Sequence, residues 1–132
     1  MPKFLSILCL MLGSFVAQAD DAKVYFIEPK DGAVVKGPVK ILFGLKGMGV
    51  APAGTDKPGT GHHHLIVNAP LPEMLYSIPA DENHIHFGGG QTETVLYLKP
   101  GKHTLQLLLG DLNHIPHKKP VFSKVITITV TE

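Results

Sequence analysis

The sequence is poor in residues that form disulfides, bind phosphate or give a strong net charge. Its 132 residues include a single cysteine, no tryptophan and no arginine, and the formal net charge is +1. Without arginine the chain lacks the planar guanidinium groups that bind phosphates, and its lysines and acidic residues nearly balance. These absences argue against nucleic acid and other polyanions as partners.

The amino-terminal end has the pattern of a secretion signal. Lys3 supplies a positive charge, the run "FLSILCLML" is apolar, and Ala17 and Ala19 place small residues where a signal peptidase cuts. We predict that residues 1–19 are a signal peptide and that the mature protein is periplasmic or secreted. A retained anchor is the alternative, but the apolar run over 4–17 is shorter than the roughly 20 residues of a spanning helix. We therefore expect no stable membrane insertion after cleavage.

Cleavage would remove the only cysteine, Cys9. The mature chain, residues 20–132, would then offer neither a disulfide framework nor a thiolate metal site, although an exported location permits disulfides. A metal ion would have to be bound by imidazole, carboxylate or thioether groups.

Short runs of valine, isoleucine, leucine and threonine are separated by eleven prolines and fourteen glycines, which is typical of an all-β domain. In the run 38–46, Val39, Ile41, Phe43 and Leu45 alternate with other residues, which predicts a strand with one buried face. We expect strands at 23–29, 38–46, 62–68, 92–98, 102–110 and 122–130, and a short one after the turn that starts "KDG". The turn "KPGK" at 99–102 predicts a hairpin between its flanking strands.

About seven short strands in one domain predict an immunoglobulin-like antiparallel β-sandwich that spans residues 20–132. The segments 47–61 and 69–91 are rich in glycine and proline and are expected to form long loops. Long ordered loops in a compact domain are usually functional.

Eight histidines are the most distinctive chemical feature of the chain. In "TGHHHL", the period of a strand places His62 and His64 on one side and His63 on the other, beside Leu65 and Val67. Two imidazoles with His-x-His spacing can bind one ion.

The other histidines extend this pattern. "NHIHFGGG" repeats the His-x-His spacing at His84 and His86, and "NHIPH" places His114 and His117 around a proline that stiffens the loop. His103 shares the predicted core face of its strand with three leucines. It is either a buried histidine with a hydrogen-bond partner or a ligand at the mouth of the sandwich.

These clusters predict a metal site. The candidate ligands are His62, His64, His84, His86, His114 and His117, and the further ligands or orienting residues are His63, His103, Met48, Asp111 and Glu93. Imidazole without thiolate suits Cu(II), Zn(II) or Ni(II), and the usual order of affinities favours copper, with zinc as the alternative. Because imidazole must be neutral to bind a metal, affinity should fall as the pH drops through about 6.5.

Simpler roles compete with this interpretation. Each histidine taken alone could be a polar residue that hydrogen-bonds a loop carbonyl. Met48 could pack in the core instead of binding Cu(I), and Asp111 could cap a turn after Gly110.

Five motifs in this order resemble the bacterial exported family known as domain of unknown function DUF4399: "GLKGMGVAPAG", "TGHHHL", "NHIHFGGGQTE", "PGKHTLQLLLGD" and "HIPH". The resemblance covers about residues 28–130. The family's final motif is His-x-Pro-His-x-Pro-Pro, and Lys119 here replaces the first of the last two prolines. The resemblance implies a small secreted or periplasmic β domain and supplies no activity.

We therefore predict a periplasmic metal-binding protein, not an enzyme, that acts in metal trafficking, storage or sequestration. Its expected partners are the metal ion and another periplasmic or envelope protein. One alternative is a non-metal interaction module that uses the 47–61 and 69–91 loops. Another is a copper redox enzyme, since "NHIHFGGG" faintly resembles the His-x-His strand of copper-zinc superoxide dismutases, but the cysteine pair is absent. A serine hydrolase is disfavoured because the chain has no Gly-x-Ser-x-Gly motif.

Overall fold

The computed structural model describes residues 21–132, so the predicted signal peptide and its cleavage point lie outside the described residues. The described chain contains nine strands and no helix that could cross a membrane. The strands are β1 (Lys23–Glu28), β2 (Val34–Lys36), β3 (Val39–Lys46), β4 (Gly49–Val50), β5 (Thr60–Val67), β6 (His84–His86), β7 (Glu93–Leu96), β8 (Gly101–Gly110) and β9 (Ile126–Thr131).

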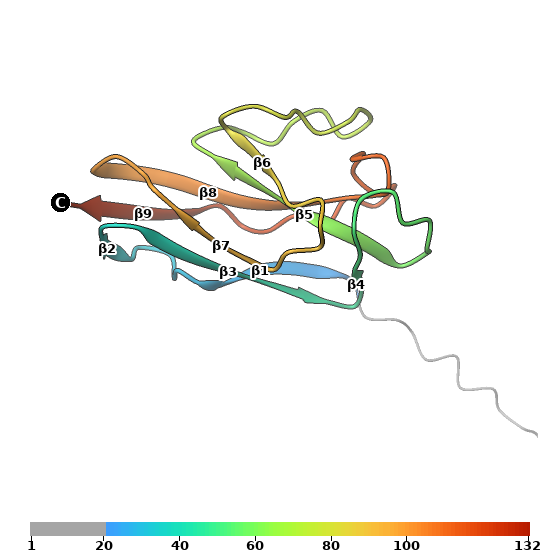
Figure 1. Ribbon diagram of the computed structural model, residues 1–132, viewed down its shortest axis with the longest axis horizontal. Helices are drawn as coiled ribbons and strands as arrows, with labels where there is room; N and C mark the ends of the chain where they lie inside the picture. Colours follow the sequence, from blue (N-terminus) through green and yellow to red (C-terminus); the bar gives the residue numbers. More distant parts are fainter. Residues whose placement is uncertain (1–20) are drawn as a thin grey trace, which may run out of the picture.

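The strands form two layers, which Figure 1 shows one above the other. One sheet has the order β1-β3-β7, and the other has the order β2-β9-β8-β5-β4, with β6 also paired to β5. Most pairs are antiparallel, but β2 runs parallel to β9 and β4 runs parallel to β5. The predicted all-β sandwich is confirmed, and the two strands beyond the expected seven, β4 and β6, come from the segments predicted as long loops.

The predicted hairpin at residues 99–102 is wrong. β7 pairs with β3 in the first sheet, whereas β8 pairs with β5 and β9 in the second, so the chain crosses between the layers. A Pro-Gly pair indicates only that the chain turns locally. Which strand each flanking strand pairs with depends on how its side chains are buried against residues far away in sequence.

The core fills the space between the two sheets. Val39, Ile41 and Phe43 of β3 are buried, which confirms the alternation predicted for that strand. Opposite them, β8 contributes Leu105 and Leu107, both fully buried. Burying such side chains stabilises the fold by roughly 1.5–3 kcal/mol each.

β5 is buried on both faces, which is unusual for a strand of a small antiparallel sandwich. Its inward face joins the core through Leu65 and Val67. On its outward face, Ile66 packs with Leu108 and with Ile78 from the segment between β5 and β6. The loops that follow β5 and β8 therefore cover the outer face of the second sheet, and His62 and His64 lie on that covered face.

Candidate metal centre

The three consecutive histidines of β5 divide between its two faces, as the period of a strand requires. The rings of His62 and His64 lie 4.7 Å apart, centroid to centroid, on the outer face. His63 points inward and lies against Phe43 at 5.0 Å. All three side chains are almost completely buried.

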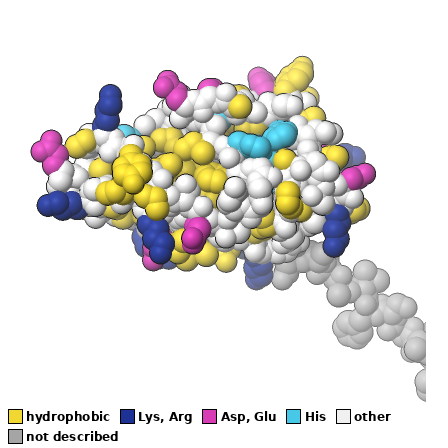
Figure 2. Space-filling model, in the orientation of Figure 1, with side chains coloured by type: hydrophobic (Ala, Val, Ile, Leu, Met, Phe, Trp, Pro, Cys, Tyr) yellow, Lys and Arg dark blue, Asp and Glu magenta, His cyan; other side chains and the backbone are white. Residues whose placement is uncertain are grey.

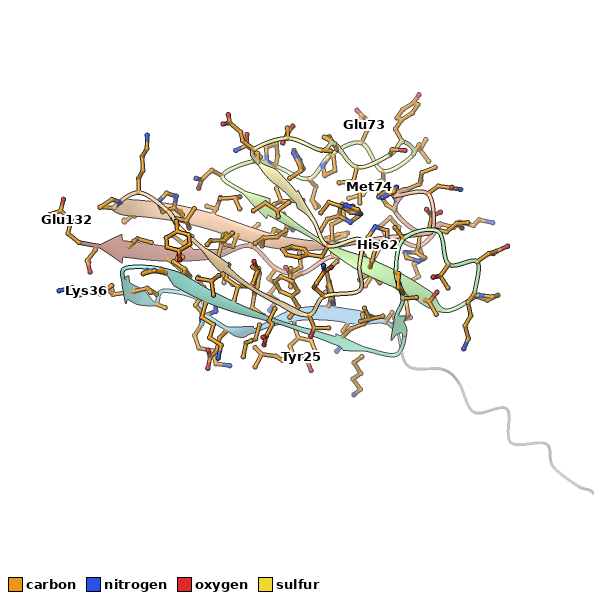
Figure 3. All side chains as sticks on the ribbon, in the orientation of Figure 1. Tyr25, Lys36, His62, Glu73, Met74 and Glu132 are labelled. Carbon is orange, nitrogen blue, oxygen red and sulfur yellow. The ribbon has the colours of Figure 1, made fainter. Side chains whose placement is uncertain are left out.

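Two more imidazoles join His62 and His64. β6 pairs with β5 so that His86 lies opposite His64, and the loop after β8 brings in His114. We call His62, His64, His86 and His114 the four-histidine cluster. The remaining distances between their ring centroids are His62–His86 5.0 Å, His62–His114 5.0 Å, His64–His86 5.1 Å, His64–His114 6.0 Å and His86–His114 4.5 Å. In Figure 3, the labelled His62 lies where β5, β6 and this loop approach one another.

The spacing of the ring nitrogens fits a metal ion. One nitrogen from each of His62, His86 and His114 can be chosen so that all three lie within 4.8 Å of one another. The Nε2 atoms of His62 and His86 are 3.2 Å apart. Two nitrogens bound tetrahedrally to one ion at about 2.0 Å would be separated by about 3.3 Å. The cluster of three histidines could therefore hold a metal ion.

His64 forms the buried end of the cluster. Neither of its ring nitrogens has a hydrogen-bond partner among the described residues, and both are shielded from solvent. Leaving such a group unsatisfied costs about 1–3 kcal/mol, a cost that the buried nitrogens of His63 on the other face share, so a ligand bound by His64 would remove part of it. Gly110 makes room for the ring, because a Cβ there would lie 2.6 Å from Cε1 of His64.

Burial favours the neutral form of three of these rings, those of His62, His64 and His86. Burial lowers the pKa of His64 to about 3, with smaller effects from His62 and the other cluster rings. Burial and the neighbouring His86 and His114 lower the pKa of His62 to about 4, and burial lowers the pKa of His86. Neutral imidazole has the free lone pair that a metal requires.

A short turn fixes His114. Its φ of 64° lies in the left-handed region, which costs a residue other than glycine about 1–3 kcal/mol. The Oδ1 atom of Asp111 accepts hydrogen bonds from the backbone N–H groups of Asn113 at 2.8 Å and Ile115 at 3.0 Å. Ile78 also donates its N–H to the carbonyl of His114 at 2.7 Å. Asp111 thus shapes the loop that presents His114.

The other two candidate ligands have partners elsewhere. His84 donates from Nδ1 to the carboxylate of Asp81 at 2.7 Å, and His117 donates from Nε2 to the carbonyl of Thr60 at 2.9 Å. Neither belongs to the group of histidines whose nitrogens converge. The structure thus brings together the rings of four of the six candidate ligands, and the nitrogens of three of them, His62, His86 and His114, converge.

Of the five additional candidates, Asp111 shapes the turn that presents His114, and the other four lie apart from the cluster. His103 donates to the carbonyl of Lys99 at 2.7 Å and accepts from the amide of Asn68 at 2.9 Å, which satisfies both ring nitrogens. Met48 packs against the core between the sheets, and Glu93 is exposed on β7 in the other sheet. The two nitrogens of His63 are buried in the core with no partner among residues 21–132, and burial lowers the pKa of His63 to about 4.

The site also depends on glycines, which sequence reasoning did not single out as part of it. A Cβ at Gly88 would lie 2.6 Å from Nε2 of His86, and one at Gly110 would meet His64. The sequence signal for these two glycines was their position, two residues after the His-x-His pair for Gly88 and at the end of the strand that precedes His114 for Gly110.

Residues 41–131 match the sequence profile of the family described as Domain of unknown function (DUF4399). The chain belongs to this family. The match confirms the resemblance seen in the motifs and includes every histidine of the cluster. The DUF4399 description states no activity.

The wider comparisons bear on fold alone. No curated protein matches this DUF4399 chain. An X-ray structure of the endo-β-1,4-mannanase from Thermotoga petrophila is similar with a TM-score of 0.54 and 18% sequence identity, over 88% of this chain and 21% of that one. The chain thus spans about a fifth of that protein's length, and at this identity the likeness shows the fold alone.

Proposed function

We propose that this DUF4399 protein is an exported, periplasmic metal-binding protein that holds one Cu(II) ion, or alternatively Zn(II), in the four-histidine cluster. Its role would be metal trafficking, storage or sequestration, without catalysis. The observation that carries the proposal is the convergence of His62, His86 and His114, each with one nitrogen within 4.8 Å of the others, beside the ring of His64, whose two buried nitrogens have no partner among the described residues.

Hydrogen bonding within the cluster does not account for this arrangement. A neutral imidazole has one N–H and one lone pair, so the 3.2 Å contact of His62 and His86 satisfies one nitrogen on each ring. The nitrogens of His64 gain nothing from that contact. An ion at the centre would use the lone pairs of several rings at once.

The donor set supports copper or zinc over other ions. All cluster ligands are imidazole nitrogens, and the thioether of Met48 packs against the core instead. Nitrogen donors without sulfur or carboxylate disfavour Cu(I), Mg(II) and Ca(II), and the order of affinities places Cu(II) above Zn(II). The carboxylate of Asp111 is close enough to His62 to influence its pKa, so it would offset part of the ion's charge.

The test is metal binding by the mature chain, residues 20–132, prepared without a tag. Titration with Cu(II) and Zn(II) at pH 7 should show one equivalent bound, and the Cu(II) form should show nitrogen ligands by electron paramagnetic resonance. His62→Ala and His64→Ala should abolish stoichiometric binding. His103→Ala is the matched control, because His103 has its own hydrogen-bond partners. An unaltered chain that binds neither ion would contradict the proposal.

A second candidate function is a module that binds an envelope protein without metal. Leu75 and Tyr76, in the segment between β5 and β6, are 83% and 68% exposed. Large apolar side chains exposed together commonly mark a contact surface. Binding of envelope proteins that depends on Leu75 and Tyr76 but survives the loss of His62 and His64 would favour this candidate. The copper redox alternative is tested by assaying the Cu(II)-loaded protein for superoxide dismutation.

A further inference from the structure

The four imidazoles of the cluster differ sharply in their access to solvent. His62 and His64 are each 1% exposed and His114 is partly buried, whereas His86 is exposed. Figure 2 shows histidine side chains that reach the surface of this face, bordered by uncharged and apolar atoms. The cluster is therefore closed on the side of the sheet and open on the side of His86.

The four rings also differ in how firmly the fold holds them. β5, which carries His62 and His64, has β8 on one side and β4 and β6 on the other. The loop that carries His114 is fixed by the carboxylate of Asp111. By contrast, β6 has three residues and pairs only with β5 among the described strands, and Gly88 to Gly90 follow directly after Phe87.

From this asymmetry we infer that His86 is the exchangeable ligand through which the ion enters and leaves the site. This inference rests on the proposed function. During transfer, a donor atom of the acceptor would bond to the ion on the exposed side as the bond from Nε2 or Nδ1 of His86 breaks. His62, His64 and His114 would hold the ion until the exchange is complete. The oxidation state of the ion does not change, and His86 remains neutral.

The acceptor must approach over the glycines that follow β6. Gly88, Gly89 and Gly90 carry no side chains, and the backbone of Gly88 is hydrogen-bonded to Ala53. Such a surface lets a ligand of the acceptor come close to the ion without steric obstruction. An acceptor with an imidazole or thiolate on a projecting loop would fit this opening.

The test is the rate at which the loaded protein gives its ion to excess 4-(2-pyridylazo)resorcinol, measured by stopped-flow absorbance with Zn(II) and repeated with Cu(II). His86→Ala should still take up one equivalent, because both buried ligands of β5, His62 and His64, and the ring of His114 remain, but should release it faster by about tenfold or more. His84→Ala is the matched control on the same strand, and it should leave the release rate unchanged because His84 pairs with Asp81.

A second pair of variants displaces His86 without removing it. Gly88→Ala would place a Cβ 2.6 Å from Nε2 of His86, so the ring must move and release should accelerate by about tenfold. Gly89→Ala meets only the flexible end of Gln91 and should behave like the unaltered chain.

The outcomes separate this inference from the proposed function. If His86→Ala abolishes uptake as fully as His62→Ala, or leaves the release rate unchanged, His86 is not the exchangeable ligand although the metal site stands. If the unaltered chain takes up no ion, the proposed function fails and this inference fails with it. Circular dichroism of each variant shows whether a loss of uptake comes from unfolding.

Discussion

The Nε2 atoms of His62 and His86 lie 3.2 Å apart, although 24 residues separate them in the sequence. Two protonated rings could not approach so closely, because both nitrogens would then be positively charged donors. The contact therefore requires at least one neutral ring, in agreement with the lowered pKa of each. The same separation suits two nitrogens bound to one metal ion.

The metal-free protein should lose stability in mild acid. Burial lowers the pKa of His64 to about 3 and that of His62 to about 4, whereas unfolding returns both to 6.5. Between these values the unfolded chain binds more protons, so the free energy of unfolding should decrease as the pH falls below 6.5 and level off near the folded pKa values.

The expected loss at pH 4.5 is about 2–3 kcal/mol for each of His62 and His64. Urea unfolding from pH 7.5 to 4.5 measures it, and His64→Leu should give a shallower dependence than the unaltered chain. A stability that does not change over this range would contradict the lowered pKa values.

Metal binding should persist to a lower pH than a free His-x-His peptide allows. Sequence reasoning placed the loss near the usual pKa of about 6.5. In the folded cluster, protons compete for His62 and His64 only near pH 4 and pH 3. Cu(II) titrations at pH 7 and pH 5 should therefore differ less for the protein than for a synthetic peptide of residues 60–67. An equal loss of affinity in both would show that the fold does not protect the rings.

Gly110→Ala should damage the cluster without touching a ligand. The new Cβ would lie 2.6 Å from Cε1 and 3.1 Å from Nδ1 of His64, so the buried ring must shift. We expect a stability loss of about 1–3 kcal/mol and a metal affinity at least about tenfold lower. Gly49→Ala is the matched control, because its Cβ would meet nothing closer than 3.7 Å. Thermal melting and Cu(II) titration of both variants test this prediction. Equal stability and equal metal affinity of the two variants would show that Gly110 does not position the ring of His64.

Asp111→Ala should release the loop that presents His114. The substitution removes the acceptor for the N–H groups of Asn113 and Ile115, which should cost about 1–3 kcal/mol and weaken metal binding. Asp111→Asn keeps one side-chain oxygen in place and should restore much of the stability. Urea unfolding and metal titration of the two variants measure these effects. If both variants bind the ion as tightly as the unaltered chain, the turn has no part in positioning His114.

The sequence alone determined the all-β class and which residues of a strand share a face. These properties have a period of two residues, so they can be derived from local order, as the alternation of Val39, Ile41 and Phe43 illustrates. The same period placed His62 and His64 together on one face and turned His63 to the other. That much of the candidate site required no knowledge of distant contacts.

The tertiary structure decided which distant histidines complete the site. His84 and His86 lie on the same side of β6 and are equivalent in sequence pattern, but the register sets His86 opposite His64 and His84 opposite Ile66. Likewise, the left-handed backbone at His114 brings that residue into the cluster, while His117 donates to Thr60.

The hairpin predicted between β7 and β8 was wrong for the same reason that the sequence did not show which histidines join the cluster. Strand pairing and register depend on the total apolar surface that residues far apart in the chain bury against one another, and a local sequence pattern does not reveal that total.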